Sequence, residues 1–147
     1  MRVADALARL DQHQTDILAT IAGALKLAEG EPAVVRMALA RARWKLARQL
    51  REYQVFKHNE IFGPATLSGT PLHAERARAM AQHCTDNGEQ FQDYLKRWSS
   101  RDVVQQWEEY KPAMLAMTSQ LRRMLAVERG NVVALLAGSA RTRQLHA

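Results

Sequence analysis

The chain has 147 residues, of which 47% are hydrophobic and 24% charged, and its formal net charge is +6. A chain of this length is expected to form one domain around a continuous core. Its single cysteine, Cys84, excludes an intrachain disulfide framework and any metal site built from several cysteines, and it favours a reducing, cytoplasmic location.

The first half of the chain predicts a helical hairpin. Apolar residues recur at three- and four-residue steps over 2–28 and again over 32–61, which is the spacing of one face of an α-helix. Pro32 suits the first turn of the second helix, and the Gly63–Pro64 pair is a strong stop signal at its end. Residues 64–71 contain two prolines and a glycine, so we expect them to form the longest loop.

The second half predicts another pair of helices, over about 72–97 and 101–136. Ser99 or Ser100 is expected to cap the last helix, and Pro112 is expected to kink or split it. The final ten residues, GSARTRQLHA, show no helical periodicity. We therefore predict one domain over 1–137, followed by a flexible tail over 138–147.

Four amphipathic helices with mostly short links predict an all-α protein, an antiparallel up-down-up-down four-helix bundle. The two halves also resemble each other. The segments QLREYQVFK (49–57) and QLRRMLAVE (120–128) occupy the second helix of each hairpin, and a histidine lies near the start of each first helix. This is either an internal repeat or a chance similarity between two amphipathic hairpins.

Glu128 falls on an apolar stripe, between Leu125 and Val132. An ionised carboxylate among apolar groups is costly unless it is paired, hydrogen-bonded or bound to a metal. Other residues at core spacing could meet it, because the stripes of a bundle face one another. Those residues are His13, Tyr53, Lys57, His73 and Met124.

This arrangement resembles the hemerythrin-like (HHE cation-binding) family, an antiparallel four-helix bundle that holds a non-haem diiron centre. The stretch LDQHQTDI would place His13 at the family's ligand on the first helix. The stretch LHAERARAM would place His73 at the ligand on the third helix, and MLAVE would place Glu128 at the last carboxylate. The resemblance covers nearly all of residues 5–136.

The chain departs from the family pattern at four ligand positions, one of which is Ala77, where the second histidine of the third helix would fall. Tyr53 and Lys57 stand where the resemblance implies a histidine and a glutamate on the second helix, and Met124 stands where it implies a histidine on the fourth. A shifted register that pairs Gln54 with His58 would restore one nitrogen ligand.

These departures suggest three possible arrangements of the bundle interior around Glu128. A lysine at a bridging position would put positive charge where two cations belong, so we predict that Lys57 pairs with Glu128 and that no cofactor is bound. Alternatively, a single iron or zinc ion could be held by His13, His73 and Glu128, with His58 added in the shifted register. In a third arrangement, Glu128 simply extends outward to solvent.

The sequence therefore predicts a non-catalytic regulatory or interaction module with an unidentified protein partner. The alternative function is a metal-binding protein for O2, NO or redox sensing. Binding of nucleic acid is a weaker alternative, because the positive residues of 36–57 spread around the helix and no RNA- or DNA-binding motif accompanies them. No apolar run approaches the ~20 residues that span a bilayer. The sequence does not indicate an oligomeric state.

Overall fold

The computed structural model describes residues 2–145, and it describes the side chains of all of these except residue 68 and residues 140–145. Every regular element in this part of the chain is helical, as the sequence predicts. The four long helices are α1 (Val3–Leu27), α2 (Pro32–Lys57), α4 (Pro71–Ser99) and α5 (Trp107–Leu145). A π-helical turn, η1 (His58–Phe62), and a short helix, α3 (Gly63–Ser68), connect α2 to α4.

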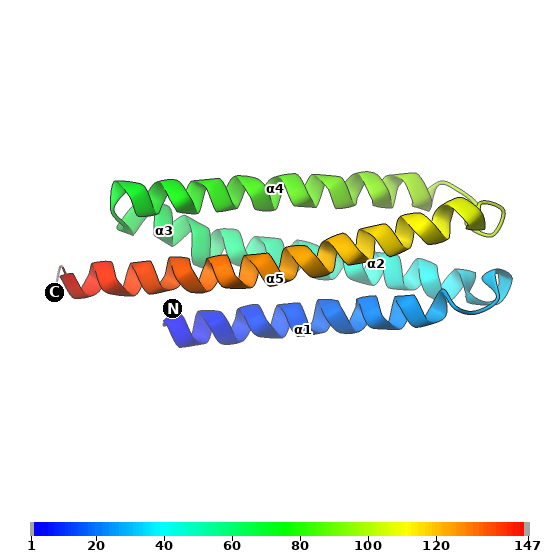
Figure 1. The fold of residues 1–147 in the computed structure, drawn as a ribbon, viewed down its shortest axis with the longest axis horizontal. Coiled ribbons are helices and arrows are strands. Elements are labelled where there is room, and N and C mark those ends of the chain that lie inside the picture. The colour runs from blue at the N-terminus through cyan, green and yellow to red at the C-terminus, as the bar shows by residue number, and fades with distance from the viewer. Residues whose placement is uncertain (1, 146–147) are drawn as a thin grey trace.

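The four long helices enclose one elongated core. Helix α1 packs against α2, α2 against α4, α4 against α5, and α5 returns to pack against α1. The start of α1 and the end of α5 lie toward the same end of the molecule (Figure 1). Within residues 2–145, no helix is both long enough and apolar enough to cross a bilayer.

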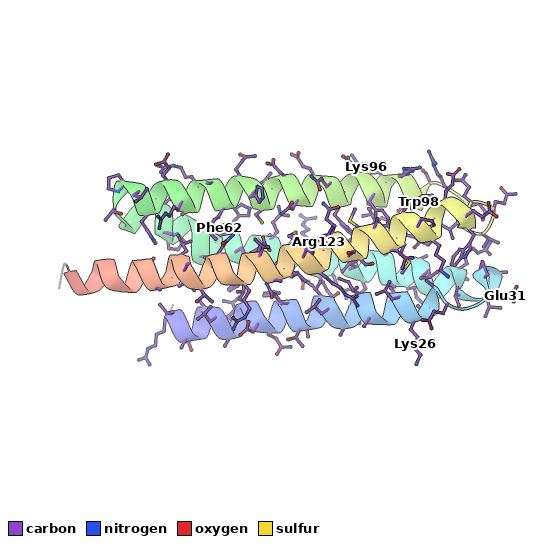
Figure 2. The ribbon with its side chains drawn as sticks, viewed as in Figure 1. Lys26, Glu31, Phe62, Lys96, Trp98 and Arg123 are labelled. Carbon is purple, nitrogen blue, oxygen red and sulfur yellow. The ribbon has the colours of Figure 1, made fainter. Side chains whose placement is uncertain are left out.

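The apolar stripes predicted from the sequence form the larger part of the core. It is built on α1 by Leu10, Ile17 and Ile21, and on α5 by Leu121, Leu125 and Val132. A second cluster fills the end at which α4 turns into α5, where Trp98 is buried (Figure 2). Its members are Ala28, Leu39, Trp98, Val103, Tyr110 and Met114.

The predicted stop after residue 61 was wrong. Helical backbone continues through η1 and α3, so the expected loop over 64–71 shrinks to Gly69 and Thr70. The Gly63 N–H reaches the His58 carbonyl, and Pro64 lies at the start of α3, where a missing N–H is tolerated. The wider π turn thus carries the chain past the Gly–Pro pair without a break.

Both ends of the last helix differ from the prediction. Helix α5 begins at Trp107, and the turn before it is closed by Asp102, whose Oδ1 accepts from the N–H groups of Val104 and Gln105 at 3.0 and 3.3 Å. Pro112 does not split α5, although it lies inside the helix at its sixth residue, beyond the four N-terminal N–H groups that lack partners, and it deprives the helix of one backbone donor. The helix also continues past 137 to Leu145, while the predicted tail residues 146–147 lie outside the described residues.

Two glycine substitutions should change stability in opposite directions. A Cβ added at Gly130, in the exposed middle of α5, meets nothing within 4 Å, so Gly130→Ala should raise the free energy of unfolding by about 0.5–1 kcal/mol. A Cβ at Gly69 would collide with the His73 ring, so Gly69→Ala should lower it. Urea denaturation measures both, and shifts of the same sign would contradict the packing described.

Candidate functional site

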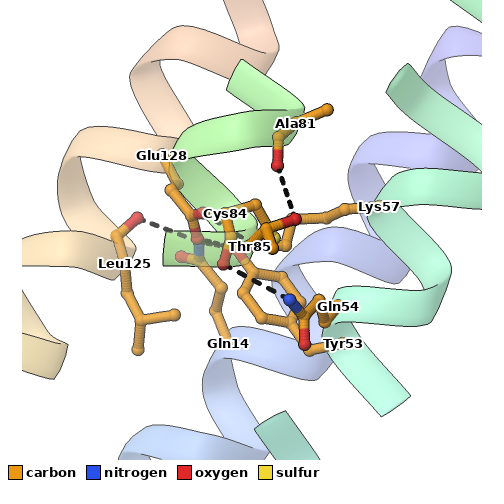
Figure 3. A network of polar contacts seen from close by, with 9 residues as sticks. All are labelled: Gln14, Tyr53, Gln54, Lys57, Ala81, Cys84, Thr85, Leu125 and Glu128. Atoms are coloured by element: carbon orange, nitrogen blue, oxygen red, sulfur yellow. Dashed lines mark hydrogen bonds and ion pairs between the residues drawn. The ribbon is translucent and has the colours of Figure 1, made fainter. Parts of the chain in front are cut away.

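A buried polar network surrounds Glu128 in the larger part of the core. Its Oε2 lies 2.6 Å from Lys57 Nζ, and its Oε1 accepts a 2.9 Å hydrogen bond from the Tyr53 hydroxyl (Figure 3). Lys57 is 2% exposed and Glu128 is 14% exposed. The ion pair predicted from the sequence is therefore present, and Glu128 faces inward.

Helix α1 joins the network through Gln14, which sequence reasoning missed. The Gln14 amide donates to the Tyr53 hydroxyl and to the Leu125 carbonyl, each at 2.9 Å. A signal for Gln14 did exist, since it lies four residues after Leu10 and three before Ile17. His13 satisfies the same stripe with the two steps reversed, so periodicity alone could not choose between them.

The Tyr53 hydroxyl, one of the donors to Glu128, keeps its proton at neutral pH. Burial raises the pKa of Tyr53, and the neighbouring Glu128 carboxylate raises it further. The Lys57 ammonium also lies 4.0 Å from the centre of the Tyr53 ring, so it meets both the carboxylate and the ring face. The charge of Glu128 is thus balanced by an ammonium and stabilised by a phenol.

Helix α4 closes the network with neutral groups. Cys84 is buried, burial raises the pKa of its thiol, and its carbonyl accepts from the Gln54 amide at 3.3 Å. Gly88 leaves room for that amide, because a Cβ there would lie 2.8 Å from Gln54 Nε2. The Cys84 thiol is therefore a poor nucleophile, in agreement with its position on an apolar stripe.

A cavity of about 340 Å³ lies beside the network, between α2, α4 and α5. Tyr53, Lys57, Cys84 and Glu128 line it together with Met124, which the sequence also placed in this layer. The remaining wall combines apolar and amide side chains with one arginine and one glycine, namely Ala47, Leu50, Arg51, Gln54, Asn87, Gly88, Phe91, Gln92 and Leu121. Its volume is at the lower end of the range for small-molecule sites.

The three histidines proposed as ligands lie in three separate places. His13 is half-buried where α1 meets α2, and its ring centroid lies 5.1 Å from that of Phe56 and 5.8 Å from that of Tyr53. His73 is buried at the start of α4, where its Nε2 lies 2.8 Å from Ser139 Oγ. His58 packs its ring edge-on against Phe62 in η1.

These positions do not assemble the metal site implied by the resemblance. Among residues 2–145, no three His, Cys, Asp or Glu side chains come close enough to share a metal ion. Ser139, the partner of His73, is eleven residues beyond Glu128 on α5, or about 16 Å along the helix axis. The Tyr53/Lys57 register is the inward one, with both residues buried, so His58 does not replace a ligand there.

No family model matches the chain, and comparisons with curated proteins and with solved structures find no match. Membership of the hemerythrin-like family stays a prediction from the sequence.

Removing one partner of the buried pair should cost more than removing both. Lys57→Met leaves Glu128 without its counter-charge and should lower the free energy of unfolding by about 3–5 kcal/mol. Adding Glu128→Leu should recover a large part of that loss, because no uncompensated charge remains. Chemical denaturation of the two single variants and the double variant measures the coupling.

The exposed ion pair between Arg129 and Asp11 provides the control, since both side chains are about half exposed. Asp11→Asn should change stability far less than Lys57→Met. Equal destabilisation by Lys57→Met and by the double variant would contradict a compensating role for Lys57.

Two histidines should make the fold less stable in mild acid. Burial lowers the pKa of His13 below its ordinary 6.5, helped by Arg9, and burial lowers that of His58, helped by Lys57. Between these folded-state values and 6.5 the unfolded chain binds more protons, so the free energy of unfolding falls as the pH drops through this window. Urea denaturation between about pH 7.5 and pH 5.5 should show the decrease, and His13→Asn with His58→Asn should reduce it.

Proposed function

We propose that this protein is a non-catalytic regulatory or interaction module, built on a hemerythrin-like four-helix bundle whose interior is closed by an ion pair in place of metals. The observation that carries the proposal is the 2.6 Å contact between Lys57 and Glu128 in the core. It supplies the carboxylate with a protein cation at the layer where the family resemblance implies metal ions.

The arrangement of the helices supports an up-down-up-down topology. Successive long helices are joined by short links at 28–31 and 100–106, and by η1 and α3 before 69–70. Each packs against the next, and α5 returns beside α1. Followed by colour, the chain reverses direction from one long helix to the next (Figure 1).

The chemistry of the network supports a structural role for it. Lys57 and Glu128 compensate each other, while the raised pKa values of Tyr53 and Cys84 keep the phenol and the thiol protonated. The protonated phenol and thiol are poor nucleophiles, and both carboxylate oxygens of Glu128 are already engaged, by Tyr53 and by Lys57. The network instead holds α1, α2 and α5 in one relative arrangement.

The residues present do not fit a diiron centre. The donors that the resemblance implies, His13, His73 and Glu128, do not converge, and Lys57, at the implied bridging position, pairs its ammonium with the Glu128 carboxylate. A metal-binding function in O2, NO or redox sensing would require α1 to rotate about its axis and α4 to shift along its own. It is kept as the outcome that would overturn the proposal.

Metal analysis tests this proposal. Protein purified without tags or chelators should contain far less than one iron or zinc ion per chain and show no visible absorption from an oxo-bridged diiron centre. Calorimetric titration with Fe²⁺ or Zn²⁺ should give no stoichiometric binding.

Glu128→Gln is the matched variant, because it keeps the shape of the side chain and removes its charge. About one or two metal ions per wild-type chain, lost in Glu128→Gln, would overturn the metal-free interior and establish the alternative.

A further inference from the structure

The outer face of α2, opposite the core, carries a heptad pattern of its own. Seven positions at alternating steps of three and four residues are exposed along it, namely Val34, Met37, Arg41, Trp44, Arg48, Arg51 and Val55. The four apolar members are far from buried: Val34 is 78% exposed, Met37 65%, Trp44 57% and Val55 51%. Exposed apolar residues at this regular spacing are the seam of a helix that has no partner helix beside it.

This helix carries a strong excess of positive charge. Residues 32–57 contain seven basic side chains and one acidic side chain, an excess of six that equals the formal net charge of the whole chain. Lys57 and Arg43 are used inside the fold, by Glu128 and by the Tyr110 hydroxyl respectively. The other five basic side chains are exposed on α2: Arg36, Arg41, Lys45, Arg48 and Arg51.

The surface of the outer face is shaped to receive side chains. A hollow of about 550 Å³ is lined by Met37, Ala40, Arg41, Trp44, Lys45 and Arg48. The set 37, 40, 41 and 44 has the spacing of the four residues that form one hole of a coiled coil, and 41, 44, 45 and 48 form the next hole. The small Ala40 between Met37 and Trp44 gives the first hole its depth.

We propose that the outer face of α2 binds an acidic amphipathic helix of a partner protein. Carboxylates of the partner would meet Arg41, Arg48 and Arg51, and its apolar side chains would cover Val34, Met37, Trp44 and Val55. The inference rests on the proposed interaction-module function, and it adds the surface and the chemistry of the partner.

Other occupants fit this face less well. A second copy in a parallel pair would bring Arg41 against Arg41 and Arg48 against Arg48, and in either orientation it would bring two basic faces together. In a helix that lies on a bilayer, basic residues flank the apolar stripe, whereas Arg41, Arg48 and Arg51 lie within it. Nucleic acid would pair with the arginines but would leave the exposed Val34, Met37 and Val55 uncovered.

Reversing the charged residues first on the protein and then on the peptide tests the proposal. The probes are two fluorescent synthetic helices, one designed for each orientation, with leucine facing the apolar members of the face and glutamate facing its three arginines. One of them should bind, and Arg41→Glu with Arg48→Glu should weaken that binding about tenfold or more. The same peptide with lysine in place of glutamate should then bind this variant better than it binds the wild-type protein.

The matched control reverses two exposed arginines elsewhere, Arg78→Glu on α4 and Arg122→Glu on α5, and should leave peptide binding unchanged. Circular dichroism shows that each variant is folded. Failure of both glutamate peptides to bind more tightly than the lysine peptides would overturn the proposal. A second outcome would also overturn it. In that outcome the peptides do not bind, and the wild-type protein instead binds phosphatidylserine vesicles, binds duplex oligonucleotide or self-associates. The double variant would lose that binding or self-association.

The two proposals fail separately. If the protein contains stoichiometric metal and still binds the acidic peptide, only the proposal of a metal-free interior is contradicted. If the protein is metal-free and does not bind the peptide, only the inference about the outer face of α2 is contradicted.

Discussion

The compensation of one buried carboxylate sets the interior of this protein. Glu128 is held by the Lys57 ammonium and the Tyr53 hydroxyl, and Tyr53 in turn accepts from Gln14. Each of these contacts requires its helix to present one particular side chain to the core. The rotational settings of α1, α2 and α5 are therefore coupled, because turning any one of the three would leave a buried polar group without its partner.

Helix α4 contributes to the interior in a different way. It gives no charge to the Glu128 pair, and beside the network it presents Cys84 and the small residue Gly88. These leave space for Gln54 and for the cavity between α2, α4 and α5. Its two ends are held by separate contacts, His73 with Ser139 at one end and the aromatic cluster around Trp98 at the other. The long bundle is thus held in three places along its length.

Helix α2 has two faces with different chemistry. Its inner face carries Leu39, Leu46 and Tyr53 at seven-residue steps and ends in Lys57, whose charge is satisfied within the fold. Its outer face repeats the same period with exposed apolar and arginine side chains, whose charges are left to solvent or to a partner. The inner face of α2 is thus committed to the core, and the surface that we propose for a partner helix lies on its opposite side.

The sequence by itself determined four long helices, because apolar spacing defines the buried side of a helix. It offered the Tyr53/Lys57 register of the second helix as one of two, and the Lys57–Glu128 pair as one of three arrangements around the carboxylate. The tertiary structure chose between them, with Tyr53 and Lys57 buried and Lys57 paired with Glu128. Tertiary structure decided whether Gln14 or His13 points inward, since an apolar stripe is wide enough to include both neighbours. It also placed His73 about three turns from Glu128, because periodicity within a helix carries no information about how far one helix is shifted along another. The helix ends at 64–71, at 101–106 and beyond 137 were decided in the same way, by packing and by local backbone hydrogen bonds that override the stop signals of glycine and proline.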